Sequence, residues 1–260
     1  TTDEKGYGIS GWLNPGDYVL EETTAPDGYA KRTDLIKVSV TEGTQNVPIQ
    51  IENEPLKSIQ VKKVDGSGKP LKGATFQIFE GELAQGLLLG TAVTDETGFC
   101  TFTNLEPGKT YSIKELSAPE GYTKPAAPSE NGQIIVVTTP KEAEKAEDNV
   151  VIVADAVTNY KKVNISFTKY SDMDGKESAL AGAEFTLYEW NGTESGNVVS
   201  SATSDASGKV TFEGIDYMRW DDDDGWKPAQ YYLEETKVPD GHAETTGRVI
   251  RVLENGTIKD

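Results

Sequence analysis

The chain has 260 residues, of which 43 are acidic and 25 are basic, giving a formal net charge of -18 at pH 7. Such an acidic balance excludes nucleic acid as a partner and disfavours insertion into anionic membranes, because both present negative phosphates. The single cysteine and single histidine exclude a disulfide framework and leave little from which to build a zinc or transition-metal site, so no metal and no cofactor are expected.

Residues 1–55 carry the later part of a repeated unit. Its most regular segment is YVLEETTAPDGY at residues 18–29, in which an alternating strand pattern runs into a Pro-Asp-Gly turn signal. A last strand, VPIQIENEP, is predicted at residues 47–55. We therefore expect a turn at Lys5-Gly6, a short strand that ends before the Pro-Gly turn at residues 15–16, and further strands at residues 18–22, 35–40 and 47–55.

Residues 56–160 carry a complete copy of the unit. The same segment recurs as YSIKELSAPEGY at residues 111–122, and a charged run, KEAEKAEDN, at residues 141–149 is predicted to be a solvated loop or a single helical turn. A closing strand, VVIVADAVTN, ends at Asn159. The predicted strands of this copy begin with SIQVKKV and continue through ATFQIF, a strand ahead of Thr94, FCTFTNL, YSIKE, QIIVVT and the closing strand.

Residues 161–260 carry a third copy, whose motif is YYLEETKVPDGH at residues 231–242 and whose closing strand is missing. It contains an insertion, MRWDDDDGWKPAQ, which we interpret as a solvated loop. The acidic run Asp221–Asp224 in this insertion could bind calcium, but its spacing does not fit an EF-hand loop. Asp172, Asp174 and Gly175 look metal-like and are interpreted as turn residues.

The short strands and regular Gly, Pro and Asp turns predict an all-β fold built of tandem antiparallel β-sandwich domains. The domain bounds we expect are 1–55 for the C-terminal part of one domain, 56–160 for a complete domain, and 161–260 for a domain that lacks its last strand.

Each copy of the motif places a glutamate on an apolar strand face, since alternate residues of a strand share a face. These residues are Glu22, Glu115 and Glu235. Burying a lone ionised carboxylate is strongly unfavourable, so each glutamate needs a partner. The same counting puts a lysine at the end of the first strand's inward face and an asparagine at the end of the last strand's inward face. The second copy has both, Lys63 and Asn159, whereas the third copy has only the lysine, Lys169, and the first copy only the asparagine, Asn53.

A dry pocket that joins Lys63, Glu115 and Asn159 has a specific chemistry. Burial favours a neutral amine, which is a nucleophile, and a protonated acid, which can pass a proton to a leaving group. The carboxamide is the acyl donor, and the product is a Lys-Asn isopeptide bond with loss of ammonia. An ordinary buried salt bridge with asparagine as a hydrogen-bond partner is the alternative.

The segments VKKVDGSGKPLKGATF, TDETGFCTFTNLEPG, YSIKELSAPEGY and VTNY together resemble the Cna B-type domain of Gram-positive pilins and surface adhesins. The resemblance implies that Lys63 and Asn159 form an autocatalytic crosslink with Glu115 as proton shuttle. It also implies that Glu22 with Asn53, and Lys169 with Glu235, are incomplete sets of the same crosslinking residues, with Glu22 and Glu235 as the proton shuttles. It also implies an extracellular, cell-wall-anchored location and neighbouring pilin or cell-wall subunits, joined by sortase, as partners, although the chain carries no LPxTG or YPKN motif.

Three functions of different classes follow. The first is a structural stalk or shaft segment of a pilin or adhesin. The second is an adhesive module that binds a host matrix protein or glycan through insertions at residues 81–90 and 218–230. The third, an enzyme, has least support, because no repeat adds a nucleophile, base or metal site beyond the buried residues.

Overall fold

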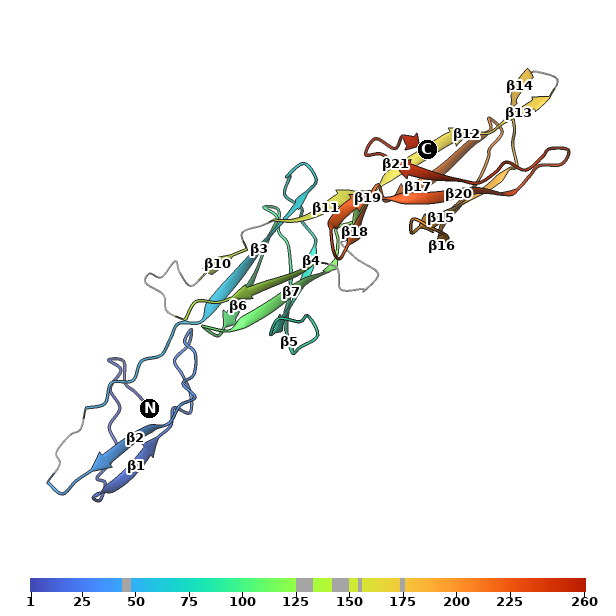
Figure 1. Cartoon of the computed structure of the whole chain (residues 1–260). Coiled ribbons are helices and arrows are strands. Elements are labelled where there is room, and N and C mark those ends of the chain that lie inside the picture. The colour runs from blue at the N-terminus through green and yellow to red at the C-terminus, as the bar shows by residue number, and fades with distance from the viewer. Residues whose placement is uncertain (44–47, 125–132, 142–149, 154–155, 174–175) are drawn as a thin grey trace. The chain divides into compact units, whose positions relative to one another are not determined.

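The computed structural model describes residues 1–43, 48–124, 133–141, 150–153, 156–173 and 176–260 (Figure 1). Every regular element in these residues is a β-strand, so the predicted all-β fold is confirmed. No helix is found there, and hence none that could cross a membrane. The chain divides into two compact units: Thr1–Ile59, Thr103–Lys109 and Thr138–Val151 form one, and Gln60–Phe102, Thr110–Val137 and Ile152–Asp260 form the other.

The first copy is built on one antiparallel pair, β1 (Gly16–Leu20) with β2 (Ile36–Val40), in which Tyr18 lies opposite Val38. None of its described residues is buried, and Trp12 is fully exposed. The short strand predicted between the Lys5-Gly6 turn and Pro15 is wrong, because residues 7–15 form no strand, and the strand predicted at residues 47–55 is wrong for the described residues 48–54, which form no ladder. Only Pro55 makes a bridge, to Tyr29, because no other described strand lies alongside this segment to pair with its backbone.

The second copy contains two sheets. One has the order β5 (Leu88–Val93), β4 (Thr75–Glu80), β7 (Thr110–Ser117), β9 (Ile134–Thr138). The other has the order β10 (Val150–Ile152), β3 (Lys57–Asp65), β11 (Val157–Lys161), β8 (Tyr122–Thr123), with β6 (Phe99–Leu105) also paired to β3. The predicted closing strand is therefore two strands, and its second part, β11, runs parallel to β3.

The third copy repeats this arrangement. Its larger sheet has the order β16 (Ser195–Thr203), β15 (Glu184–Trp190), β20 (Gln230–Lys237), β21 (Arg248–Val252), β22 (Ile258–Lys259). A separate pair joins β12 (Val163–Thr168) to β17 (Lys209–Ile215). Its buried core consists of Ile165, Ala183, Phe185, Leu187, Val210, Phe212, Ile215, Ala229, Tyr231, Leu233, Ile250 and Val252.

Two further hairpins belong to the third copy: β13 (Tyr170–Met173) with β14 (Lys176–Ala179), and β18 (Met218–Asp221) with β19 (Gly225–Pro228). The second hairpin corrects the prediction of a solvated loop. Trp220 and Trp226 lie opposite each other in its register and pack edge to face, with ring centroids 5.7 Å apart. This aromatic pair supplies the apolar contact that a short hairpin needs. Asp174, Gly175 and the charged run at 142–149 lie outside the described residues.

Candidate functional site

Lys63 lies near the end of β3, on the face that the strand buries. Its side chain is 0% exposed, and Nζ donates a hydrogen bond to the backbone carbonyl of Val157 on β11 at 3.0 Å. The same Nζ is 3.7 Å from Glu115 Oε2. Burial lowers the pKa of Lys63 to about 8, against the opposing effect of the nearby Glu115 carboxylate. A neutral amine is therefore accessible near neutral pH.

Glu115 lies on β7, directly opposite Phe76 of β4, and its side chain is 1% exposed. Neither carboxylate oxygen accepts a hydrogen bond from any residue that the structure describes. Burial raises the pKa of Glu115 to about 7, although the charge of Lys63 and the side chain of Asn159 act in the opposite direction. The carboxyl group is thus able to hold a proton at physiological pH.

Asn159 completes the buried group from β11. It is 0% exposed, and its Nδ2 donates to the carbonyl oxygen of Thr123 at 2.5 Å, while its Oδ1 has no partner among the residues described. The parallel register sets Val157 opposite Lys63 and Asn159 opposite Asp65. The structure therefore brings Lys63, Glu115 and Asn159 into one buried cluster from three strands. Their chemical roles stay predictions.

The third copy brings Lys169 and Glu235 together, but here the carboxylate accepts hydrogen bonds, unlike Glu115 in the second copy. Lys169 Nζ donates to Glu235 Oε2 at 2.9 Å, and the backbone N and Oγ1 of Thr245 donate to the same oxygen at 3.1 and 2.7 Å. Burial acts to raise the pKa of Glu235, but the hydrogen bonds from Lys169 and Thr245 hold it below its ordinary value. This pair is an ion pair with an ionised carboxylate.

The first copy brings Glu22 and Asn53 together. Asn53 Nδ2 donates to Glu22 Oε2 at 2.7 Å and to the carbonyl of Ala30 at 3.0 Å, and both side chains are partly exposed. Ala30 follows the motif at the position that Thr123 holds in the second copy. The asparagine therefore uses the same backbone acceptor in both copies.

The sequence did not reveal one set of functional residues, which lie ten positions after each motif glutamate and donate a backbone N–H to it in the first and third copies. The backbone N–H of Arg32 donates to Glu22, and that of Thr245 donates to Glu235. The residue at this position after Glu115 is Pro125, which has no N–H and lies outside the described residues. A comparison of the three copies at this position is the signal that could have drawn attention to it.

No group of three or more His, Cys, Asp or Glu side chains suited to a metal ion occurs among the described residues. In the acidic hairpin, Asp221 Oδ1 accepts backbone N–H groups from Asp223 and Asp224, and Lys227 lies 3.3 Å from Asp221 and 2.5 Å from Asp224. These carboxylates are thus engaged by the hairpin's own donors rather than arranged around a cation.

A model of the SpaA prealbumin-like fold domain matches the chain at residues 1–55, 57–149 and 163–260. The chain belongs to this family. The SpaA-type match spans all three copies of the motif, and it confirms the predicted relation to the Cna B-type domains of Gram-positive pilins and surface adhesins.

Curated proteins similar to this SpaA-type chain are of much greater length. Serine-aspartate repeat-containing protein F of Staphylococcus epidermidis is 26% identical over 270 residues, covering 99% of this chain and 14% of that protein. Serine-aspartate repeat-containing protein D of Staphylococcus aureus strain Newman is 26% identical over 215 residues, covering 75% of this chain and 15% of that protein. The chain therefore spans about one seventh of the length of these relatives.

Among solved structures, a streptococcal ancillary pilin is 21% identical, with a TM-score of 0.48, covering 92% of this chain and 72% of that one. The shaft pilin SpaA of Lactobacillus rhamnosus GG, as its D295N mutant, is 19% identical with a TM-score of 0.40, covering 78% of this chain and 95% of that one.

Proposed function

We propose that the second copy forms a covalent bond between Lys63 and Asn159. In the reaction, the neutral Nζ of Lys63 attacks the side-chain carbonyl carbon of Asn159. An N–C bond forms, the bond from that carbon to Nδ2 breaks, and ammonia leaves. Protonated Glu115 gives its proton to the departing nitrogen and takes one from the attacking amine, so it ends in the state in which it began. The reaction happens once in each molecule, so it is a maturation step and not enzymatic turnover.

One observation carries this proposal: a buried lysine and a buried glutamate lie 3.7 Å apart beside a buried asparagine, with both carboxylate oxygens left without a hydrogen bond. A pair that served only as a salt bridge would be expected to satisfy its carboxylate, because unsatisfied buried charge is costly. The pKa shifts act in the same direction, since burial brings Lys63 towards the neutral amine and Glu115 towards the protonated acid. Holding the groups in contact supplies the proximity that a slow amide exchange requires.

The consequence is mechanical. The bond would close a loop of about one hundred residues, which on the loop-entropy model stabilises a fold by about 4 to 5 kcal/mol. We propose that the chain is a stalk or shaft segment of a Gram-positive pilin or adhesin, with domains at 1–55, 56–160 and 161–260. Its location is extracellular and associated with the cell wall, and its partners are neighbouring pilin or cell-wall subunits joined by sortase.

The other two copies carry parts of the same set. Glu22 with Asn53 provides the acid and the carboxamide, and Lys169 with Glu235 provides the amine and the acid. We propose the same roles for these residues, with each set needing a third group that the described contacts do not provide.

Intact mass of the full chain tests the proposal. We expect the folded chain to be lighter than its calculated mass by one ammonia, and we expect Lys63→Met, Glu115→Gln and Asn159→Ala each to restore the calculated mass. Glu235→Gln is the matched control and should leave the deficit unchanged. Because cyclisation of any asparagine also releases ammonia, a proteolytic digest must yield a branched peptide joining the segments of Lys63 and Asn159. A full-mass wild-type chain would overturn the proposal.

A second candidate, an adhesive module, is favoured by one observation. The insertion at residues 81–90 exposes four leucines: Leu83 at 67%, Leu87 at 66%, Leu88 at 47% and Leu89 at 43%. Exposed apolar clusters mark protein contact surfaces, so this loop fits a protein ligand better than a glycan. Serine at all four positions should abolish adhesion to an immobilised matrix protein without changing the mass deficit. Unchanged adhesion would exclude this loop.

A further inference from the structure

Thr123 contacts the buried cluster of the second copy through its backbone and the third copy through its side chain. Its backbone carbonyl accepts the hydrogen bond from Asn159 Nδ2 at 2.5 Å. Its hydroxyl donates to Asp216 Oδ1 in the third copy. All three residues belong to the same compact unit of the chain, and Thr123 is buried. Thr123 therefore links the asparagine of the second copy to a carboxylate of the third.

The hydrogen bond to Thr123 sets the orientation of the Asn159 carboxamide. Nδ2 donates to the Thr123 carbonyl, while Oδ1 has no partner among the residues that the structure describes. Attack by Lys63 Nζ requires the carbonyl carbon to be held in a near-attack geometry, so the rate depends on how the amide plane is turned. A displacement of the Thr123 carbonyl would therefore turn the acyl donor away from its amine.

Threonine occupies this position in the second copy alone. The residue that follows the motif is Ala30 in the first copy and Ala243 in the third. Ala30 offers the same backbone carbonyl to Asn53, at 3.0 Å, but it has no hydroxyl. Accepting the asparagine amide thus needs no particular side chain, and the hydroxyl of Thr123 serves the contact with Asp216.

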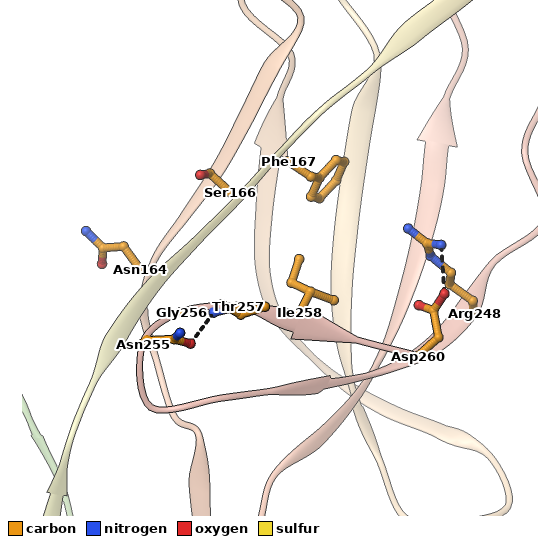
Figure 2. A pocket seen from close by; sticks show the side chains of 9 residues that line it. All are labelled: Asn164, Ser166, Phe167, Arg248, Asn255, Gly256, Thr257, Ile258 and Asp260. Carbon is orange, nitrogen blue, oxygen red and sulfur yellow. Dashed lines mark hydrogen bonds and ion pairs between the residues drawn. The ribbon is translucent and has the colours of Figure 1, made fainter.

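Asp216 is held in place by the fold of the third copy. Its backbone carbonyl accepts a hydrogen bond from the hydroxyl of Tyr231, a core residue of β20, at 2.7 Å. Two residues earlier, Gly214 has a φ of 65°, and its N–H donates to Oδ1 of Asn164 at 2.9 Å. Asn164 lies on β12, where it also lines a cavity of about 530 Å³ (Figure 2). The Asp216 carboxylate is therefore positioned by contacts that exist once β12, β17 and β20 are assembled.

Tyr160, the residue after Asn159, is also held by the third copy. Its ring packs edge to face on Tyr217 and Trp226, with ring centroids 5.7 and 4.9 Å apart. A Cβ added to Gly66 would lie 2.6 Å from the same ring, so the ring also lies directly against the backbone of the second copy. The third copy therefore holds the part of β11 that carries Asn159.

We propose that Asp216 is a positioning residue for the reaction of the second copy. Through the Thr123 hydroxyl, it holds the backbone carbonyl that orients the Asn159 carboxamide towards Lys63. The inference rests on the proposed function and adds an order of events to it. The bond in the second copy forms at its full rate after the third copy has folded and presented Asp216.

Refolding of the full chain tests the inference. Chain that has been kept unfolded in denaturant since synthesis is refolded at neutral pH, and intact mass follows the loss of ammonia over time. We expect Thr123→Val to slow this loss by about tenfold, the change in rate that corresponds to the net free energy of one hydrogen bond. Thr123→Ser keeps the hydroxyl and should retain the wild-type rate.

The partner residue is tested in the same way. Asp216→Ala removes the acceptor and should slow the loss of ammonia as Thr123→Val does. Asp216→Asn keeps a side-chain oxygen that accepts a hydrogen bond, so it should react at close to the wild-type rate. Ser39→Ala is the matched control, because it removes another hydroxyl that donates to a carboxylate, that of Asp17, and it should leave the rate unchanged.

The order of the two Thr123 variants separates positioning from strand stability. Valine favours a strand more than serine does, so a merely structural role predicts that valine is the better substitute. A serine variant slower than the valine variant would overturn the inference, as would equal rates for the wild type, Thr123→Val and Asp216→Ala. Both results would leave the proposed function standing, whereas a wild-type chain that keeps its full mass would overturn both.

Discussion

Gly98 packs directly against the backbone of Lys63. The Lys63 N–H donates to the carbonyl of Gly98 at 2.7 Å, and a Cβ added to Gly98 would lie 2.5 Å from the carbonyl oxygen of Lys63. Gly208 holds the same position in the third copy, where an added Cβ would lie 2.4 Å from the carbonyl oxygen of Lys169. In both copies, a glycine in a turn thus fixes the position of the lysine backbone.

Gly98→Ala is therefore expected to destabilise the second copy by about 3 kcal/mol or more, through left-handed strain and displacement of the β3 backbone. Gly68→Ala is the matched control, because Gly68 has a φ of 86° but nothing within 4 Å of its added Cβ. It should cost only the strain of about 1 kcal/mol. Chemical denaturation measures both, and equal losses would show that the close contact does not matter.

Thr245 holds Glu235 in its ionised form through a hydroxyl hydrogen bond of 2.7 Å. Thr245→Val removes the hydroxyl but keeps the shape and the backbone N–H, so the pKa of Glu235 should rise, because a donor that favours the charged form is lost. Carboxyl chemical shifts in an NMR titration measure this pKa. Thr236→Val is a suitable control, since the Thr236 hydroxyl hydrogen-bonds with the hydroxyl of Thr186 and the backbone carbonyl of Glu184 and makes no contact with Glu235 that the structure shows. An unchanged pKa of Glu235 would contradict the assignment.

Formation of the Lys63–Asn159 bond should follow a bell-shaped pH profile. Glu115 loses its proton as pH rises through about 7, and Lys63 gains one as pH falls through about 8. The reactive arrangement needs a protonated acid and a neutral amine, which together hold one proton, so its population is greatest between these two values.

The profile is measured on chain that has been kept unfolded in denaturant since synthesis and is then refolded at different pH values, with intact mass read over time. A rate that rises steadily to pH 10 would show that deprotonation of Lys63 alone is limiting and that Glu115 plays no acid role.

Asn159→Ala should lower the free energy of unfolding of the second copy by about 4 to 5 kcal/mol, the loop-closure value for a loop of about one hundred residues. Asn53→Ala removes an asparagine that also bonds to its glutamate, and it should leave unfolding of the second copy unchanged. Guanidinium denaturation followed by intact mass measures both. A loss of only about 1 kcal/mol for Asn159→Ala would indicate a hydrogen bond and no covalent tie.

Much of the buried cluster could be predicted from the sequence, because the two-residue period of a strand fixes which side chains share a face. This placed Lys63, Glu115 and Asn159 inward without knowledge of the sheet order. The parallel pairing of β11 with β3 could not be predicted, since strand partners distant in sequence leave no local pattern.

Three features escaped prediction for identifiable reasons. The hairpin around Trp220 and Trp226 was interpreted as a loop because four consecutive aspartates obscured the cross-strand aromatic pair. Residues 48–54 read as a strand, yet a strand exists only where a partner meets its backbone. The hydrogen bonds from the N–H groups of Arg32 and Thr245 could not be predicted, because almost every residue carries a backbone N–H and its presence leaves no pattern in the sequence.

The parallel register of β3 and β11 determines how tension would pass through the second copy. A pull entering at the start of β3 and leaving at the end of β11 acts along both strands, so their ladder is sheared as a whole instead of being peeled open one rung at a time. With Lys63 and Asn159 joined, residues 64–158 would form a side loop off the line of force. Turns of that segment that hold neither Glu115 nor Gly98 could then lengthen or carry a ligand surface without lying in the path of the force.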